Sequence, residues 1–222
     1  MTEADLRPYG RRAFLGVVGA GVLALLGGHP LQRLGEFLTP VEDAIGLGGW
    51  RIYTVGSTMP VFRPAHWRLR VDGLVERPLE LSYAQLLALP RAHQVSDFHC
   101  VTGWSIPHVH WGGVRLRDVL AAARPLPSAH ALRFVSAESP YEDSLTLQQA
   151  ALRDVMLAHH MDARPLSRAH GAPLRLVIPE MYGYKGVKWV ERIELTAQAA
   201  DGYWEQRGYD RDAWVGRSNG RV

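Results

Sequence analysis

The single cysteine of the chain, Cys100, lies in the loop-like segment Phe98–Ser105, between apolar stretches. Its thiolate could bind a soft metal or, with a base nearby, act as a nucleophile. His99, His108 and His110 are close enough in sequence to be metal ligands or that base. The spacing Cys-x7-His-x-His fits none of the usual structural zinc patterns. A third alternative is a buried, inert side chain, since a lone cysteine cannot form an internal disulfide.

A second group of polar residues lies in His170-Gly-Ala-Pro-Leu-Arg175 and in the Gly-rich segment Tyr182–Trp189. The only two lysines of the chain, Lys185 and Lys188, both occur in the Gly-rich segment. Exposed backbone N–H groups, two ammonium groups and the Arg175 guanidinium could together bind an anion such as phosphate. The alternative is a β-hairpin whose lysines point to solvent.

Periodic patterns predict the elements that hold these residues. Alternation or proline-bounded apolar runs predict strands at 67–75, 131–136, 173–179 and 187–195. Helical spacing with start and stop residues predicts helices at 82–90, 114–123 and 147–157. The order shows no regular βαβ repeat, so the pattern predicts an α+β domain rich in sheet and loops.

The composition is that of a folded domain. The chain has 222 residues, 47% of them hydrophobic and 21% charged, which suits one domain with a buried core. Its formal net charge is +3, and the basic residues form no cluster. Nucleic-acid binding is therefore not expected.

The N-terminal segment has the pattern of an export signal. Arg11 and Arg12 precede an uncharged apolar run, Ala13–Gly28, whose 16 residues are fewer than the ~20 that cross a bilayer. The Arg-Arg-x-Phe-Leu pattern resembles twin-arginine signals; an ordinary secretory signal or a membrane anchor is the alternative. No clear cleavage site follows, so an uncleaved anchor is compatible with the pattern. We predict a signal or anchor at 1–28, a linker at 29–49 and the folded domain at 50–222.

The motifs resemble those of the sulfite oxidase family of molybdopterin-dependent oxidoreductases, in the same order along the chain. The Cys100 segment with Trp111-Gly-Gly-Val-x-Leu is similar to the molybdenum-ligand segment of that family. His-Gly-x-Pro-Leu-Arg and Gly-x-x-x-Val-Lys-Trp are similar to its pterin-binding stretch, and 71–75 and 202–209 also match. The resemblance covers residues from about 53 to 209 and is greatest to the bacterial branch of periplasmic protein-methionine-sulfoxide reductase catalytic subunits.

The resemblance implies a sulfite oxidase-type molybdopterin-binding fold, with molybdenum and molybdopterin as cofactors. It implies that Cys100 is both the catalytic residue and the thiolate ligand of the metal. It also implies cofactor contacts at eight positions: Tyr53, Thr54, Ser136, His170, Arg175, Gly186, Val187 and Lys188.

The chain departs from sulfite oxidases at one informative point. Animal and plant enzymes of the family follow the ligand cysteine with Ala-Gly-Asn-Arg, whereas this chain has Val-Thr-Gly-Trp104. An arginine-rich sulfite pocket is therefore not indicated. Because the sequence ends at Val222, we expect neither the C-terminal immunoglobulin-like dimerisation domain nor a haem domain.

The function that follows from this resemblance is two-electron oxygen-atom transfer in the periplasm or another extracytoplasmic space, with reduction of a sulfoxide-type substrate as the leading hypothesis. The alternatives are sulfite oxidation, a Cys/His zinc or thiol hydrolase, and a non-catalytic binding module. The family implies an external electron donor, such as a membrane haem protein. Trp104, Trp111 and His108 are candidates for the substrate-side wall; the alternative for them is core packing.

Overall fold

The computed structural model describes residues 49–219. The predicted export signal (1–28) and residues 29–48 of the predicted linker lie outside these described residues. Within 49–219, no helix has both the length and the apolar character needed to cross a bilayer.

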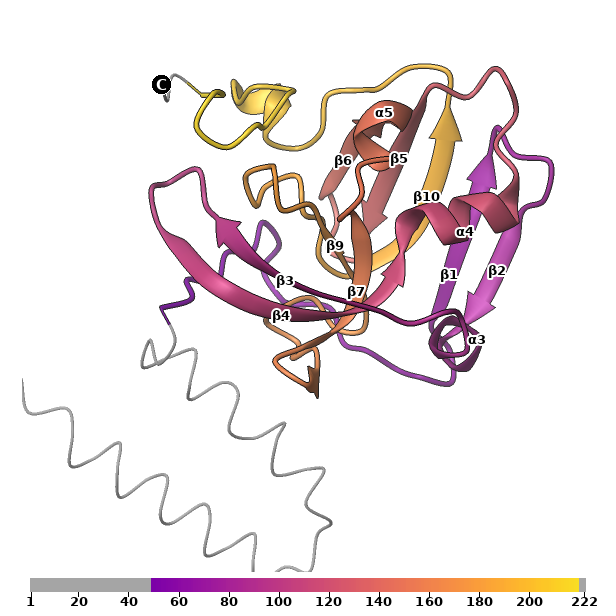
Figure 1. Cartoon of the computed structure of the whole chain (residues 1–222), viewed down its shortest axis with the longest axis horizontal. Coiled ribbons are helices and arrows are strands. Elements are labelled where there is room, and N and C mark those ends of the chain that lie inside the picture. The colour runs from indigo at the N-terminus through magenta and orange to yellow at the C-terminus, as the bar shows by residue number, and fades with distance from the viewer. Residues whose placement is uncertain (1–48, 220–222) are drawn as a thin grey trace, which may run out of the picture. The chain divides into compact units, whose positions relative to one another are not determined.

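The first of two sheets contains β1 (Arg68–Gly73), β2 (Leu79–Ser82), β5 (Ala131–Ser136), β6 (Glu142–Thr146) and β10 (Val190–Thr196). Its strand order is β2-β1-β10-β5-β6 (Figure 1). The central pair β1 and β10 is parallel, and the other pairs are antiparallel. Strands far apart in sequence thus lie side by side, and β10 directly follows the loop that contains both lysines.

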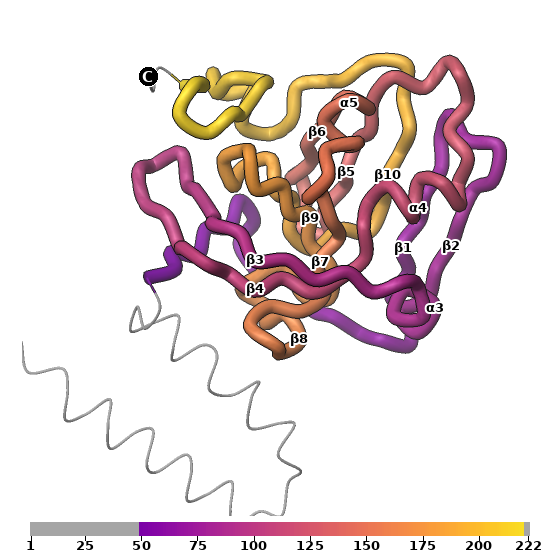
Figure 2. Tube along the Cα trace, in the orientation of Figure 1, coloured from indigo at the N-terminus to yellow at the C-terminus, as the bar shows by residue number. Residues whose placement is uncertain are grey.

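The second sheet contains β3 (Ala92–His99), β4 (Ser105–Arg115), β7 (Met156–Met161), β8 (Arg164–Pro165) and β9 (Arg175–Val177). The order is β3-β4-β7-β8, with β9 also paired to β7; β8 is labelled in Figure 2. Strands β3 and β4 form a long antiparallel hairpin whose turn is the Cys100 segment. The hairpin therefore holds the thiol at the end of a sheet.

Short helices connect the strands: α3 (Tyr83–Leu87), α4 (Leu116–Ala123), α5 (Leu147–Ala150) and the 3-10 helix η1 (Glu205–Arg207). Ser82 and Thr146 begin α3 and α5 with capping boxes, in which each hydroxyl accepts from the backbone N–H three residues later. Most of the regular structure is strand, which confirms the α+β, sheet- and loop-rich prediction.

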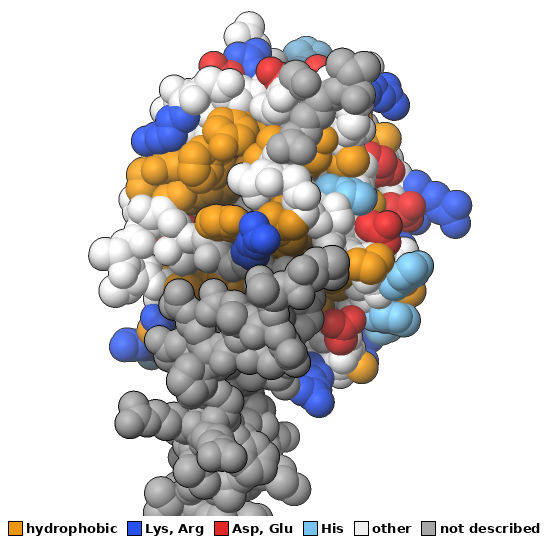
Figure 3. Space-filling view, turned by 90° about the vertical axis from the view of Figure 1, so that its left-hand side faces the viewer, with side chains coloured by type: hydrophobic (Ala, Val, Ile, Leu, Met, Phe, Trp, Pro, Cys, Tyr) orange, Lys and Arg blue, Asp and Glu red, His pale blue; other side chains and the backbone are white. Residues whose placement is uncertain are grey.

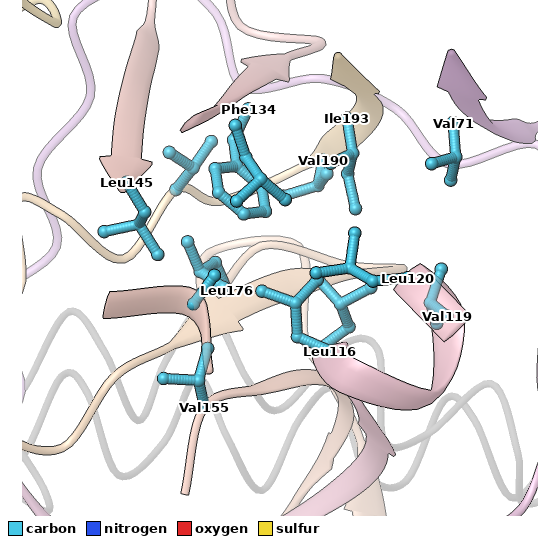
Figure 4. Close-up of a cluster of buried hydrophobic side chains, with 14 of the residues drawn as sticks. Val71, Leu116, Val119, Leu120, Phe134, Leu145, Val155, Leu176, Val190 and Ile193 are labelled. Carbon is cyan, nitrogen blue, oxygen red and sulfur yellow. The ribbon is translucent and has the colours of Figure 1, made fainter. Parts of the chain in front are cut away.

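The main core lies between the first sheet and the elements that pack on it. In Figure 4, Phe134 and Ile193 of the sheet face Leu116 and Leu120 of α4 and Leu176 of β9. All of these side chains are buried. Since α4 directly follows β4 and β9 belongs to the second sheet, this core fixes the two sheets relative to each other.

The helix predicted at 147–157 is wrong over most of its length. Only Leu147–Ala150 is helical, and strand β7 begins at Met156. The apolar residues of this segment satisfy helical spacing, but a continuous apolar run also suits a strand buried on both sides, and pairing of β7 with β4 and β9 decides the outcome.

The strand predicted at 131–136 matches β5 (Ala131–Ser136), and the other predicted elements are present with shifted ends. The helix predicted at 114–123 begins at Leu116, because Val114 and Arg115 still pair with β7 as the end of β4. The strand predicted at 187–195 begins only at Val190. Residues 187–189 instead belong to the loop before β10, and this places Lys188 where a ligand can reach it.

Candidate functional site

A cavity of about 190 Å³ lies where five separate segments of the described chain meet. Its walls come from 50–55, the turn region at 98–104, residues 138 and 141 after β5, the residues from 169 to 188 around β9, and the C-terminal segment at 204 and 209. Figure 2 shows the C-terminal segment and the turn between β3 and β4 on the same side of the molecule. Figure 3, which views that side, shows hydrophobic side chains gathered on it with a Lys or Arg side chain among them.

The turn at 100–104 presents the thiol to this cavity. Cys100 N–H donates to Trp104 O at 2.9 Å, and Gly103 N–H donates to Cys100 O at 3.0 Å. Gly103 has φ of 94°, a conformation that glycine adopts without a steric penalty. Cys100 is partly exposed, and its Sγ lies 3.1 Å from Thr102 Oγ1. The cysteine is therefore neither deeply buried nor part of the hydrophobic core.

The Arg175 guanidinium is the buried cation of the cavity wall, at only 4% exposure. It lies between two aromatic rings, 5.6 Å from the Phe98 centroid and 5.2 Å from the Trp111 centroid. Nη1 donates to His170 O at 3.3 Å, while Nε has no hydrogen-bond partner among residues 49–219. Burial lowers the pKa of Arg175 to about 10, so it is still charged at neutral pH.

His170 lines the cavity beside this cation and is 3% exposed. Burial, followed by the positive charges of Arg175 and Lys188, lowers its pKa to about 3. Its imidazole is therefore neutral at physiological pH and can both donate and accept a hydrogen bond. The ring also contacts Trp50 edge-on, with centroids 4.8 Å apart.

The two lysines are in different surroundings. Lys188 lines the cavity, donates from Nζ to Tyr53 O at 2.6 Å and lies 4.2 Å from the Trp189 ring centroid. Lys185 is 1% exposed and pairs with Asp143 at 2.5 Å and Glu205 at 2.8 Å. We call these three residues the Lys185 cluster. The expectation that both lysines bind an anion thus fails for Lys185, as does the alternative of two solvent-facing lysines.

The remaining predicted contact residues divide into two groups. Tyr53 and Gly186 line the cavity. Thr54 is exposed and is not part of the lining. Val187 is fully buried, with its carbonyl accepting from Leu176 N–H at 2.8 Å. Ser136 is also buried outside the lining.

Ser136 acts on the cavity through the backbone of a residue that lines it. Its hydroxyl donates to Lys188 O at 2.8 Å and accepts from Glu138 N–H at 2.9 Å. The serine thereby links β5 to the loop before β10. This arrangement makes Ser136 a support for the lysine.

Glu138 is a cavity residue that no sequence motif singled out. It is 4% exposed, and its Oε1 accepts from Val55 N–H at 2.9 Å and Gly56 N–H at 3.1 Å. The carboxylate thereby attaches the 50–56 segment to the end of β5. Trp204 and Tyr209, also in the lining, were likewise not selected as site residues.

Of the three candidates for a substrate-side wall, one lines the cavity. Trp104 does so and stacks with Tyr53, the ring centroids being 6.5 Å apart. Trp111 is buried beneath Arg175, and His108 is exposed on β4 with φ of 54°. Trp111 is thus a core residue that supports the guanidinium.

The histidines near Cys100 do not gather around it. His99 Nδ1 lies 2.8 Å from Ser105 Oγ, and His110 is exposed on β4. Within residues 49–219, no three His, Cys, Asp or Glu side chains are placed to hold a metal ion together. A zinc site of the usual kind needs three or four such ligands. A metal held by one protein thiolate and by a second, non-protein ligand does not need such a group of side chains.

The donor set suits a phosphate-bearing, metal-binding cofactor. The unpartnered Nε of buried Arg175 would be satisfied by an acceptor oxygen of an anion. A side chain at Gly186 would meet Leu176 O at 3.0 Å, so glycine lets this part of the loop pack closely on β9 at the cavity wall. Cys100 supplies a thiol at the same cavity. These features fit molybdopterin, with its phosphate and its metal-binding dithiolene.

Comparison with known proteins identifies the family of this chain. Residues 56–204 match the family model described as "Oxidoreductase molybdopterin binding domain". The chain is 37% identical to the uncharacterized oxidoreductase YuiH of Bacillus subtilis (strain 168) over 150 residues, 67% of this chain and 75% of that protein. It is 30% identical to the protein-methionine-sulfoxide reductase catalytic subunit MsrP of Gluconobacter oxydans (strain 621H), over 96% of this chain and 76% of that protein.

A solved structure shares the fold. The sulfane dehydrogenase SoxCD from Paracoccus pantotrophus superposes with a TM-score of 0.61 and 28% identity over 65% of this chain. The match spans 41% of that structure's chain. The predicted sulfite oxidase-type fold is thereby confirmed, as is the resemblance to the bacterial methionine-sulfoxide reductase branch. The chain belongs to the family of molybdopterin-binding oxidoreductase domains.

Proposed function

We propose that the chain is an exported molybdenum enzyme that reduces a sulfoxide-type substrate by two-electron oxygen-atom transfer. The observation that carries the proposal is the meeting of Cys100, Arg175, His170 and Lys188 at one cavity. Cys100 comes from the turn between β3 and β4 and the other three from residues 170–188, and together they provide a metal ligand and anion-binding groups. The similarity to MsrP supports a sulfoxide as the substrate class.

Each of these residues has a defined part in holding the cofactor. Arg175 and Lys188 would bind its phosphate through charge-assisted hydrogen bonds, and neutral His170 would hydrogen-bond the pterin. Gly186 would hold its loop close to β9 at the wall of the cofactor site. Molybdopterin, when bound, supplies the redox-active metal for oxygen-atom transfer, with Cys100 as its protein ligand.

In the proposed reaction, a sulfoxide takes up two electrons and two protons and yields a thioether and one molecule of water. The sulfur–oxygen bond breaks, sulfur is reduced, and the oxygen leaves as water. Because the sequence contains one cysteine, the chain cannot supply the four thiolates of an iron–sulfur cluster. We propose an external donor for the two electrons, a membrane haem protein being the class that the resemblance implies.

The aromatic wall near the thiol favours an uncharged sulfur substrate. Tyr53 and Trp104 stack, and Trp50 contacts Trp104 with ring centroids 6.1 Å apart. All three line the cavity that Cys100 lines. Thioether sulfur packs favourably against aromatic rings, so the thioether product suits this wall.

Sulfite oxidation is a second candidate because of Arg51. This arginine is exposed and also lines the cavity, where it could attract an anionic substrate. Turnover of sulfite in preference to a sulfoxide, lost in Arg51→Gln, would establish this alternative.

Export by the twin-arginine pathway is supported by the pattern around Arg11 and Arg12. Replacing both with lysine should retain the protein in the cytoplasm, as shown by fractionation of cells that express the full chain. Normal export of this variant would instead favour an ordinary secretory signal.

The deciding experiment is metal and pterin analysis of the full chain, produced in a host that loads other molybdenum enzymes. Elemental mass spectrometry and fluorescence of the oxidised pterin should give about one molybdenum and one pterin per chain. Turnover of sulfoxides and of sulfite is then measured with a reduced dye and an oxidised dye, respectively. Bound zinc with no pterin would favour the hydrolase alternative, and a loaded metal that never cycles would favour the binding module.

A further inference from the structure

The hydroxyl of Thr102 points at the sulfur of Cys100. Oγ1 and Sγ are 3.1 Å apart, within the range of a hydrogen bond to sulfur. Within residues 49–219, no other side chain is hydrogen-bonded to this sulfur. Thr102 therefore lies at hydrogen-bonding distance from the thiol, which none of the neighbouring histidines does.

The backbone of the turn fixes this contact. The bonds from Cys100 N–H to Trp104 O and from Gly103 N–H to Cys100 O close the turn on both sides of Thr102. The threonine side chain is exposed and lines the cavity, so packing in the core does not explain its position. Its β-branched side chain has few rotamers, which further restricts the hydroxyl.

The direction of the hydrogen bond follows from the state of the sulfur. A thiol and a hydroxyl can each donate, but a thiolate can only accept. When Cys100 acts as a metal ligand, its sulfur is a thiolate. Thr102 must then be the donor, and the bond is charge-assisted.

We propose that Thr102 is a positioning residue that donates its hydroxyl to the Cys100 thiolate and so sets both the direction and the donor strength of the metal ligand. The inference rests on the proposed function, because it takes Cys100 as the ligand of molybdenum. A hydrogen bond to a ligating sulfur withdraws electron density from it, which makes the metal easier to reduce. In a reductase, this bond would favour acceptance of electrons from the donor.

The test compares the full-length, cofactor-loaded wild type with Thr102→Val and Thr102→Ser. Valine keeps the shape of threonine and removes the hydroxyl, and serine restores it. Thr58→Val is the matched control, because Thr58 is exposed and outside the cavity lining. For each protein, the measurements are molybdenum content, the molybdenum EPR spectrum and the reduction potential by dye-mediated titration. Thr102→Ala, which also lacks the hydroxyl, replaces Thr102→Val in this comparison if the valine variant does not fold.

We expect Thr102→Val to shift the potential to more negative values and to alter the EPR spectrum, with Thr102→Ser and Thr58→Val close to wild type. Loss of molybdenum from Thr102→Val but not from Thr102→Ser would also support the proposal. An unchanged potential and spectrum in loaded Thr102→Val would overturn it. A serine variant that behaves like the valine variant would overturn it too.

Failure of the proposed function is distinguishable from failure of this inference. A wild type that binds no molybdenum would refute the function. A crystal structure of that cofactor-free protein would still test the contact, since separation of Thr102 Oγ1 from Cys100 Sγ beyond hydrogen-bonding distance would refute the positioning role on its own.

Discussion

The Lys185 cluster and the cavity wall each contain a buried positive charge, but the groups that surround it differ. In the cluster, two buried carboxylates surround one ammonium group, and all three side chains are shielded from solvent. In the cavity wall, the buried guanidinium of Arg175 faces aromatic rings and a backbone carbonyl, and its Nε has no partner among residues 49–219. Lys185 and Lys188 are three positions apart, yet each belongs to a different one of these regions.

The difference teaches how to separate structural from ligand-binding charge. A buried cation that the fold neutralises contributes to the folded state, and removing it leaves carboxylates without a partner. A buried cation whose hydrogen-bonding capacity the fold leaves incomplete has a donor available to a ligand. The comparison therefore predicts loss of stability at the Lys185 cluster and loss of cofactor or activity at the cavity.

The largest effect should follow from Cys100→Ser. Loss of an outer partner of a metal ligand typically costs ~10–100-fold, and loss of the ligand itself should exceed this range. The fold should be largely preserved, because Cys100 is partly exposed in a turn. Turnover and thermal unfolding of the purified variant check both statements. Retained turnover with molybdenum loaded would refute the role of Cys100 as ligand.

Lys185→Met should destabilise the protein by about 3–5 kcal/mol, because Asp143 and Glu205 would be left buried without their cation. Lys188→Met is the matched control within the same loop. It should lower pterin content while changing the free energy of unfolding little. Urea unfolding and pterin fluorescence of both variants are the measurements. Equal destabilisation by the two substitutions would contradict the predicted difference between the two regions.

Arg175→Ala should lower cofactor occupancy by the loss of a charged hydrogen bond, worth roughly 1.5–3 kcal/mol. This corresponds to about a 10- to 150-fold weaker binding. Molybdenum and pterin content per folded chain are the measurements. Unchanged content would exclude Arg175 as a phosphate ligand.

A further prediction concerns pH. Burial raises the pKa of Asp143 to about 7, although Lys185 opposes the shift, so the folded protein keeps a proton that the unfolded chain loses above about pH 4. This carboxyl therefore makes stability fall as the pH rises from about 4 to about 7. Asp143→Asn should remove that decline. Urea unfolding at several pH values tests it, and a constant difference between wild type and variant would contradict the prediction.

His159 should act in the opposite direction over the same range. Burial, and then the nearby His160, lowers its pKa to about 4, so the unfolded chain binds more protons than the folded protein between about pH 4 and 6.5. Its contribution to stability is lost as the pH falls through this window. His159→Gln is thus the control that isolates the contribution of Asp143.

The sequence singled out residues whose types could carry the chemistry, and the structure brings several of them together. Cys100, His170, Arg175 of the proline-bounded strand and Lys188 of the Gly-rich loop all line the cavity. The sequence was not sufficient where a side chain acts through a long-range partner. Glu138 holds backbone 82 and 83 residues away, and Lys185 meets Asp143 42 residues away. Nothing local distinguishes such residues from ordinary surface charges.

Element prediction failed for a related reason. The ends of β5 can be recognised from the residues next to it in sequence. Its predicted range agrees with the observed Ala131–Ser136. β7 is defined by strands that come before and after it, β4 and β9, so its apolar run alone could equally indicate a helix. Val187 and Ser136 illustrate the same limit at the site, since both are expected cofactor contacts but are buried outside the cavity lining.

The walls of the cavity also imply an order of events during synthesis. Residues 50–55 precede every strand of the described chain, whereas Trp204 and Tyr209 follow β10, and all of them except Thr54 contribute to the same cavity. A ribosome that has completed both sheets has therefore not yet completed the cavity. On the proposed function, the cofactor would be captured only after residue 209 has emerged, so a truncated nascent chain would fold its sheets without being able to retain the prosthetic group.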